Sequence, residues 1–289
     1  MRDIVIKQIE SRIAEMVKPN GNFREERLAR KQQSLRQRNA EILKVKVNGK
    51  VDNITNRGQN TIITYHLHFQ NLIKQKQFIY LEEEVERRYS VLDHNEVVKD
   101  EEVYKEGHQG DDDTRLIVEE NDDQRVTYRY DRLKAVQYAE LWWDDYNPAY
   151  KKFEVDCTNF ISQCLHAGGA PMRGHGNRSK GWWMGGNNWS YSWSVANSLR
   201  WYLPSSTVGL RAKEVNEPEE LQLGDVICYD FEGDGRTNHN TIVTAKDVYG
   251  SPLVNAHTYN SRMRFWNYED STAYTPNIQY KFFSIVDDE

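Results

Sequence analysis

Two kinds of hydrophobic pattern follow one another in the first hundred residues. In residues 1–44, apolar side chains recur at helical spacing among Arg, Glu and Gln, as at Ile9, Ile13 and Met16. A Pro-Asn-Gly-Asn turn at 19–22 interrupts this pattern, which predicts two helices rather than one. Runs rich in β-branched and aromatic residues then predict three strands, at 43–47, 61–69 and 76–84. Residues 1–106 are therefore expected to form a helical and antiparallel-sheet α+β domain.

A change of composition separates this part of the chain from the rest. The stretch 107–126 is acidic and contains glycine, which is typical of a linker. All eight tryptophans lie at or after Trp142 and all three cysteines at or after Cys157. Residues 127–289 are therefore expected to form a second domain. The smaller N-terminal domain resembles the cystatin/NTF2-like shape, in which a helix packs on a curled sheet, and it is a candidate for binding a protein partner.

The second domain begins with two predicted helices. Asp131 can cap a first helix, which stops before Pro148. Cys157 opens another helix, whose apolar residues fall at i, i+3 and i+4 spacing, at Phe160, Ile161, Cys164 and Leu165. Gly168 ends this helix. Three strands are predicted downstream, at 221–231, 238–244 and 253–257. The order predicts an α+β fold in which a helix packs on an antiparallel sheet.

Cys157 is the candidate nucleophile because it stands at the first turn of a buried helix. The unpaired N–H groups and the positive dipole end found there stabilise a thiolate, so a lowered pKa is expected. Cys164 lies two turns deeper on the core face and is expected to be a packing residue. A thiolate needs an imidazole partner for acyl transfer, and His239 stands at the start of a downstream strand. Asn255 and His257 share one face of the next strand and are candidates for orienting that imidazole.

Composition excludes several classes of partner. The net charge of −6 and the pI near 5.8 argue against a phosphate-backbone binder, so no nucleic-acid partner is expected. No apolar stretch suits a signal peptide or a transmembrane helix, which predicts a cytoplasmic protein without a membrane partner; a sporulation-related compartment is the alternative. Three cysteines without Cys-x-x-Cys spacing fit a reducing compartment. A zinc site would need more ligands than Cys157, His239 and His257, so no metal or other cofactor is expected.

Several linked motifs occur in order in the second domain. They are Asp156-Cys157-Thr158-Asn159-Phe160, Ser162-Gln163-Cys164, Leu223-Gly224-Asp225-Val226-Ile227, His239 with Ile242-Val243-Thr244, and His257-Thr258. Together they resemble a family of amidase domains seen in Bacillus-type bacteria, a branch near the NlpC/P60 and CHAP hydrolases of the papain-like superfamily. The resemblance implies a papain-like fold for the second domain, with Cys157 as nucleophile and His239 as general base and later acid.

The resemblance also implies the remaining site residues. The NlpC/P60 pattern makes Asn255 the residue that orients His239, whereas the amidase branch makes it His257, which we favour. An oxyanion hole would use the backbone N–H of Cys157 with a side-chain donor from among Asn147, Tyr146 and Asp156. Independently of the resemblance, the loop-like pair Trp182-Trp183 is a candidate lining for a substrate cleft.

The sequence thus predicts a cysteine-dependent amide-bond hydrolase, an amidase or peptidase that acts through a Cys–His–polar triad and an acyl-enzyme. A peptide such as a cell-wall (peptidoglycan) fragment is the expected substrate, on family resemblance alone. The alternative is a non-catalytic binding or spore-coat-associated protein, which keeps the papain-like fold without the activity.

Overall fold

The computed structural model describes residues 2–18, 23, 25–94, 96–103 and 127–288. The chain divides into two compact units. The first comprises Met1–Lys105 together with Tyr259–Tyr274, and the second comprises Glu106–Thr258 together with Thr275–Glu289. A late segment of the chain therefore belongs to the N-terminal unit. The predicted linker at 107–126 lies outside the described residues.

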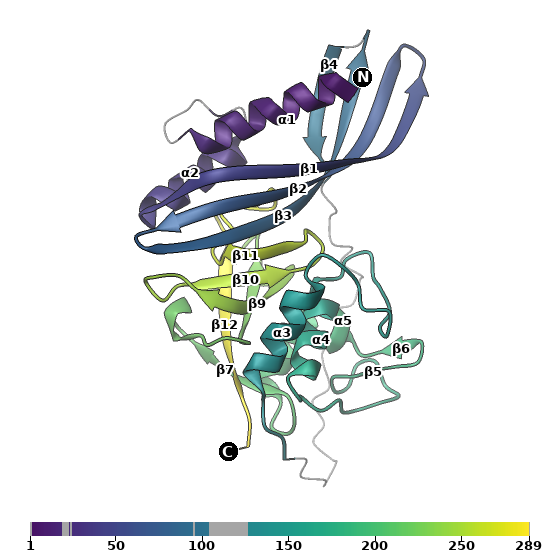
Figure 1. Ribbon diagram of the computed structural model, residues 1–289. Coiled ribbons are helices and arrows are strands. Elements are labelled where there is room, and N and C mark those ends of the chain that lie inside the picture. Colours follow the sequence, from purple (N-terminus) through teal and green to yellow (C-terminus); the bar gives the residue numbers. More distant parts are fainter. Residues whose placement is uncertain (1, 19–22, 24, 95, 104–126, 289) are drawn as a thin grey trace. The chain divides into compact units, whose positions relative to one another are not determined.

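The N-terminal unit consists of helices on an antiparallel sheet (Figure 1). Its elements are α1 (Arg2–Val17), α2 (Glu26–Gln37), β1 (Ala40–Arg57), β2 (Asn60–Gln75), β3 (Phe78–Asp93), β4 (Glu96–Glu102) and β11 (Ser261–Phe265). Strand β2 lies between β1 and β3, while β3 also pairs with β4 and β11. The two predicted helices are present, and the three strands are longer than predicted. In β2 the alternation of buried and less buried side chains continues past the predicted stretch.

One face of β2 supplies the core of this unit. Its side chains alternate, and every second one is buried, as at Ile63, Tyr65, Leu67 and Phe69. These residues pack in one cluster with Met16 of α1 and Leu28 of α2. The period-2 pattern of the strand and the helical pattern before it therefore meet in a single core.

Strand β3 carries an unusual row of buried charge. Glu82, Glu84 and Glu86 alternate along one face and are nearly inaccessible to solvent. The side chain of Arg27 binds both Glu84 and Glu86, and Lys31 lies 3.3 Å from Glu84. Because buried carboxylates need paired cations, the N-terminal helices act as the electrostatic partners of this strand as well as its apolar cover.

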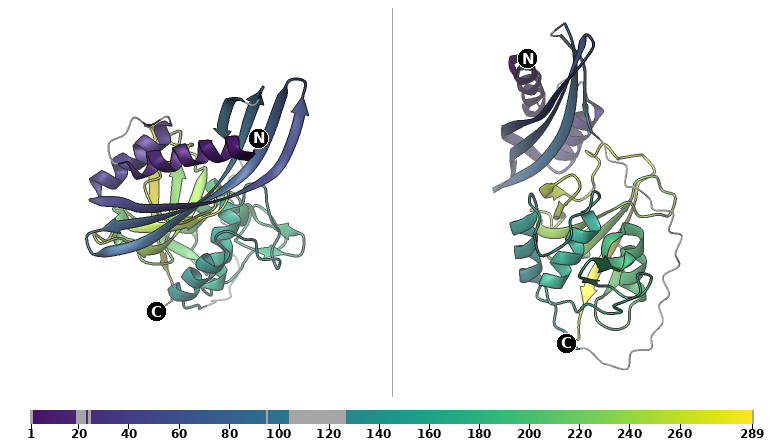
Figure 2. Two further views of the ribbon diagram at one scale, coloured as in Figure 1. Left: turned by 45° about the horizontal axis from the view of Figure 1, so that its top comes forward. Right: turned by 90° about the vertical axis from the view of Figure 1, so that its right-hand side faces the viewer.

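The C-terminal unit packs helices on one face of a five-stranded antiparallel sheet (Figure 2). The strand order is β10-β9-β8-β12-β7. The elements are α3 (Arg132–Trp142), α4 (Cys157–Ala167), β5 (Met184–Gly185), β6 (Asn188–Trp189), α5 (Tyr191–Ser194), α6 (Ala196–Ser205), β7 (Arg211–Val215), a 3-10 turn η1 (Pro218–Glu220), β8 (Val226–Asp230), β9 (His239–Lys246), β10 (Pro252–Ala256) and β12 (Gln279–Val286). The predicted α+β class is thus confirmed.

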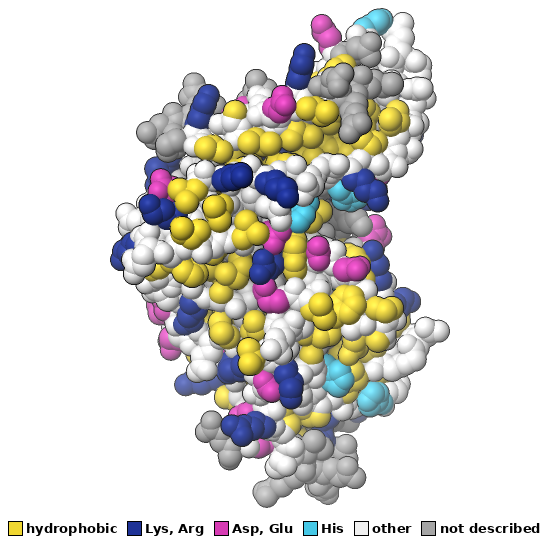
Figure 3. Space-filling model, in the orientation of Figure 1, with side chains coloured by type: hydrophobic (Ala, Val, Ile, Leu, Met, Phe, Trp, Pro, Cys, Tyr) yellow, Lys and Arg dark blue, Asp and Glu magenta, His cyan; other side chains and the backbone are white. Residues whose placement is uncertain are grey.

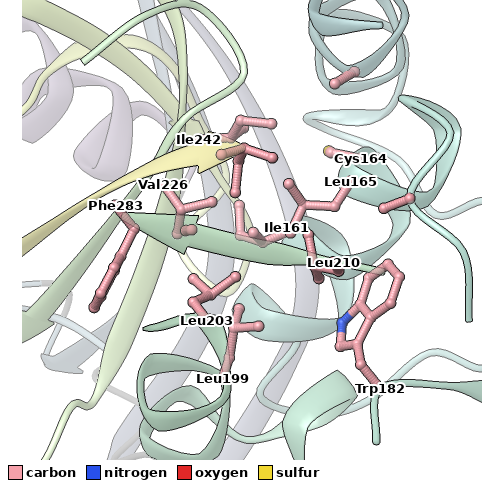
Figure 4. Packing of buried hydrophobic residues seen from close by; sticks show 14 of the residues in the cluster. Ile161, Cys164, Leu165, Trp182, Leu199, Leu203, Leu210, Val226, Ile242 and Phe283 are labelled. Carbon is pink, nitrogen blue, oxygen red and sulfur yellow. The ribbon is translucent and has the colours of Figure 1, made fainter. Parts of the chain in front are cut away.

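Figure 4 shows how α4 is held in this unit. Ile161 and Leu165 of α4 belong to one buried cluster with Val226 of β8, Ile242 of β9 and Phe283 of β12, all fully buried. The helix begins at Cys157 as predicted, and the i, i+3, i+4 pattern forms its buried face. Burying residues of this kind stabilises the fold by roughly 1.5–3 kcal/mol each, so the start of α4 is fixed against β9.

The surface carries charges of both signs. In the space-filling view, Lys and Arg side chains are interspersed with Asp and Glu over the visible face (Figure 3). Among the described residues, no helix is long and apolar enough to span a bilayer.

Candidate functional site

The start of α4 is tied down by hydrogen bonds from several parts of the chain. Asp156, the residue before the helix, accepts through Oδ1 from the Phe153 N–H and from Asn159 Nδ2, both at 2.9 Å. The backbone N–H groups of Asp156 and Cys157 both donate to Thr258 Oγ1, at 3.0 and 3.2 Å. One hydroxyl oxygen therefore accepts from two consecutive N–H groups where the helix begins.

The Cys157 sulfur lies inside the protein. The residue is only 2% exposed, and Sγ lies 3.7 Å from Thr158 Oγ1. Burial raises the pKa of the Cys157 thiol, and the Asp156 charge acts in the same direction. Hydrogen bonds from Thr158 and from the backbone of Asn240 lower that pKa by less. The predicted low pKa is therefore wrong for this conformation, because desolvation of the thiolate outweighs the stabilisation offered by the helix start.

The side chains of His239 and Asn240 point to opposite faces of β9. His239 pairs across the sheet with Tyr229, and Asn240 pairs with Cys228. The Asn240 side chain accepts from Thr158 Oγ1 at 2.8 Å and donates to Cys228 Sγ at 2.9 Å, so it faces α4. The His239 ring lies 5.7 Å from the Tyr229 ring, on the opposite face by strand alternation. The Cys157 sulfur is near the backbone of Asn240. The ring of His239, the residue before it, is turned toward Tyr229.

His257 contacts the residue that precedes the candidate nucleophile. Its Nδ1 lies 2.9 Å from Asp156 Oδ2, and its Nε2 lies 2.6 Å from the backbone oxygen of Trp142. The imidazole stacks on Phe160 with a centroid separation of 4.0 Å and an interplanar angle of 12°. Both ring nitrogens face oxygen acceptors, and the ring joins α3, α4 and β10.

Asn255, the alternative orienting residue, contacts α3 and β9. Its Nδ2 donates to Glu140 Oε1 at 2.8 Å, and its Oδ1 accepts from Thr244 Oγ1 at 2.9 Å. It is fully buried on the sheet face that carries the helices. The shared strand face predicted for Asn255 and His257 therefore points both residues toward the helices, but the two side chains contact different partners there.

The candidate oxyanion donors lie around the start of α4 in different settings. The Tyr146 ring is 5.0 Å from the His257 ring, so it lies beside the Asp156–His257 pair. Asn147 Nδ2 donates to Tyr138 Oη at 2.9 Å, and its Oδ1 accepts from the Ala149 N–H. The Asp156 carboxylate contacts the Phe153 N–H, Asn159 Nδ2 and His257 Nδ1. Of the three candidates, Asp156 is adjacent to Cys157 in the chain, and Tyr146 contacts the His257 ring that pairs with Asp156.

Trp182 and Trp183 are interior residues in this structure. Trp182 is fully buried and donates through Nε1 to Ser162 Oγ at 3.0 Å, while Trp183 is 2% exposed. This placement differs from the predicted cleft lining. The loop around them pairs with itself at the Arg173–Trp182 bridge, and the Trp183 indole donates to the backbone oxygens of Asn177 and Lys180.

Sequence reasoning missed Thr258 as a member of the site. It follows His257 directly, and this pair is one of the matched motifs, but nothing in the sequence shows where its hydroxyl points. Its φ of +80° is rare for a β-branched residue. The three cysteines of the chain are free and buried, and no group of three His, Cys, Asp or Glu among the described residues could hold a metal ion.

Comparison with known proteins identifies the family of this chain. Residues 129–283 match the family model described as "Putative amidase domain". The Bacillus subtilis (strain 168) protein named "Uncharacterized protein YhbB" is 51% identical over 268 residues, which cover 90% of this chain and 86% of that protein. "Uncharacterized protein YjcM" of the same strain is 32% identical over 126 residues, or 40% of this chain and 28% of that protein. No solved structure matches the chain. The chain therefore belongs to the family of the "Putative amidase domain".

Proposed function

We propose that the C-terminal unit is a cysteine-dependent amide-bond hydrolase of papain-like fold with Cys157 as its nucleophile. Cys157 Sγ attacks the substrate carbonyl carbon while His239 takes the thiol proton. The C–N bond then breaks, the leaving amine receives that proton from His239, and the acyl group stays on sulfur as a thioester. Water activated by His239 attacks the thioester, which releases the acid and restores the thiol.

The observation that carries this proposal is the position of Cys157 at the first residue of a buried helix in an amidase-family domain. The Cys157 N–H already donates to an oxygen, Thr258 Oγ1. An acyl oxygen of a bound substrate would use a donor of this kind, since negative charge develops on it during attack. The sulfur is near the Asn240 backbone, one residue from His239, whose ring lies on the other face of β9.

The His239 ring must turn from Tyr229 toward the sulfur for this chemistry. Burial holds the resting thiol protonated, so we place the proton transfer after substrate binding, when His239 reaches Sγ. Catalytic hydrogen bonds often tighten only in the substrate complex.

For the third residue of the triad, the contacts favour two different roles. His257 lies against Asp156 and the Trp142 carbonyl, so we propose that it fixes the start of α4. Asn255 lies on the same face of the neighbouring strand and stays the alternative for orienting His239. In either role the residue positions another group, the start of α4 or the His239 ring, and takes no direct part in the reaction.

The proposed substrate is a peptide, with a cell-wall fragment as the first candidate and a cytoplasmic or sporulation-related location. The N-terminal unit is proposed to bind a protein partner. Incubation with purified peptidoglycan fragments, followed by mass spectrometry of the products, tests the substrate directly: a new amine and a new carboxylate must appear together.

A non-catalytic binding protein is the second candidate, and the buried thiol with its raised pKa favours it. The catalytic proposal is tested by treating the protein with p-nitrophenyl acetate and mapping the acetylated peptide. Cys164 and Cys228 are internal controls, because burial also raises the pKa of both thiols.

The hydrolase proposal requires acetylation of Cys157 in preference to Cys164 and Cys228. Cys157→Ser must abolish it, and His239→Gln must slow it by on the order of a hundredfold, the usual contribution of a general base. Acetylation of Cys157 no faster than that of Cys164 would instead support the binding-protein candidate.

A further inference from the structure

Thr258 combines three features at the start of α4. Its hydroxyl oxygen accepts from the N–H groups of Asp156 and Cys157, at 3.0 and 3.2 Å. Its backbone has a φ of +80°, a strained conformation for a β-branched residue. The side chain is partly exposed, whereas Cys157 beneath it is 2% exposed. A strained surface residue therefore places an oxygen on the backbone of the candidate nucleophile.

We propose that the Thr258 hydroxyl is an internal occupant of the oxyanion site of this domain, and that acyl transfer requires Thr258 to withdraw. The inference rests on the proposed function. It adds that the Asp156 N–H is the second backbone donor of the oxyanion site and that the resting conformation is self-blocked.

The geometry excludes joint occupancy. Two consecutive N–H groups that converge on one oxygen form a small anion-binding concavity. A substrate oxygen that accepts from the Cys157 N–H must lie about 3 Å from that nitrogen, on the side to which the hydrogen points. Thr258 Oγ1 already fills that position, and two oxygens cannot share it. The carbonyl carbon of a substrate must also reach Sγ of the same residue, so the block acts on the reacting group itself.

The backbone strain at Thr258 favours its departure from this position. The unfavourable φ offsets part of the stabilisation that its two hydrogen bonds provide. The conformation in which Thr258 binds these two N–H groups is therefore only weakly stabilised. Thr258 is also the last residue before the segment Tyr259–Tyr274, which belongs to the N-terminal unit.

The experiment compares two reactions of the Cys157 sulfur in the full chain. Iodoacetamide alkylates the sulfur without forming an oxyanion, whereas p-nitrophenyl acetate acylates it through one. The readout is the ratio of the acylation rate to the alkylation rate at Cys157, measured by peptide mapping. Thr258→Val removes the hydroxyl and keeps the β-branch, while the matched control Thr258→Ser keeps the hydroxyl and removes the β-branch.

We expect Thr258→Val to raise this ratio by on the order of tenfold, because an acyl oxygen no longer has to displace the two hydrogen bonds of the hydroxyl. Thr258→Ser should leave the ratio within about threefold of the wild-type value. Far-UV circular dichroism checks the fold of each variant, and Thr258→Ala replaces Thr258→Val should the latter not fold.

An unchanged ratio in Thr258→Val overturns the inference and leaves the hydrolase proposal standing. A lowered ratio also overturns it, since the hydroxyl would then help to stabilise the oxyanion. If neither the wild type nor any variant forms an acetyl adduct on Cys157 while iodoacetamide labels it, the proposed function fails, and the inference fails with it.

Discussion

Replacing Glu102 with glutamine should stabilise the N-terminal unit above neutral pH and change little in acid. Glu102 ends β4, and its Oε2 lies 3.2 Å from Nη1 of Arg27. Arg27 also binds Glu84 and Glu86, whose charges oppose ionisation of a third carboxylate. Burial is the largest cause that raises the pKa of Glu102 to about 7, and the charges of Glu86 and Glu84 add to it, while Arg27 lowers it.

The magnitude follows from the pKa difference between the folded and unfolded chain. A rise from 4.5 to about 7 corresponds to about 3 kcal/mol, at 1.36 kcal/mol per pKa unit. Between these pH values the folded state holds more protons than the unfolded state, so the free energy of unfolding falls as the pH rises. Above pH 7 the full penalty of the ionised Glu102 is present. Below pH 4.5 the carboxyl is protonated in both states and contributes no difference.

Urea unfolding at pH 5 and at pH 8.5, with hydrogen exchange of peptides from β3, measures this effect in the unit concerned. Glu102→Gln should raise the free energy of unfolding by up to about 3 kcal/mol at pH 8.5 and by much less at pH 5. The matched control is Glu101→Gln, which removes the same charge from an exposed neighbour. An equal change at both pH values, or destabilisation at pH 8.5, would refute this account of Glu102.

Three further substitutions test the packing described above. Arg27→Met should destabilise the N-terminal unit by about 3–5 kcal/mol in urea unfolding, because it removes the cation that Glu84 and Glu86 share; the same change at the exposed Arg87 should cost under about 0.5 kcal/mol. Asp156→Ala should lower the stability of the C-terminal unit by about 3 kcal/mol, since it strips a buried acceptor from His257 and two N–H donors, and Asp156→Asn should cost less. Gly181→Ala should lower the melting temperature, because a Cβ there would lie 2.1 Å from the Arg173 carbonyl oxygen at a φ of +66°; an unchanged melting temperature would contradict the close approach.

Local signals in the sequence were sufficient to locate the starts of α3 and α4. Asp131 was predicted to cap α3, and its Oδ1 accepts from the Lys134 N–H at 3.1 Å. The apolar spacing after Cys157 predicted α4, which begins at that residue. Such features depend on residues within one or two turns of each other, so the sequence contains them directly.

The burial of charge on β3 could not be predicted in the same way. A run of three glutamates normally indicates a solvated strand. Here the cations that pair with it come from α1 and α2, and Lys31 of α2 is bound in turn by Asp270, which pairs with Arg264 of β11. Those partners are separated from β3 by up to about 180 residues, and only the tertiary structure brings them together.

By itself the sequence determined an α+β chain with a hydrophobic helix that opens at Cys157 and a strand that opens at His239. The tertiary structure decided how these residues are surrounded. It buries the sulfur, which reverses the expected direction of its pKa; it separates the partners of Asn255 from those of His257; and it brings Thr258 onto the Cys157 N–H. The physical reason is that helix starts and strand faces are set by near neighbours, whereas desolvation and hydrogen-bond pairing depend on residues about a hundred positions away.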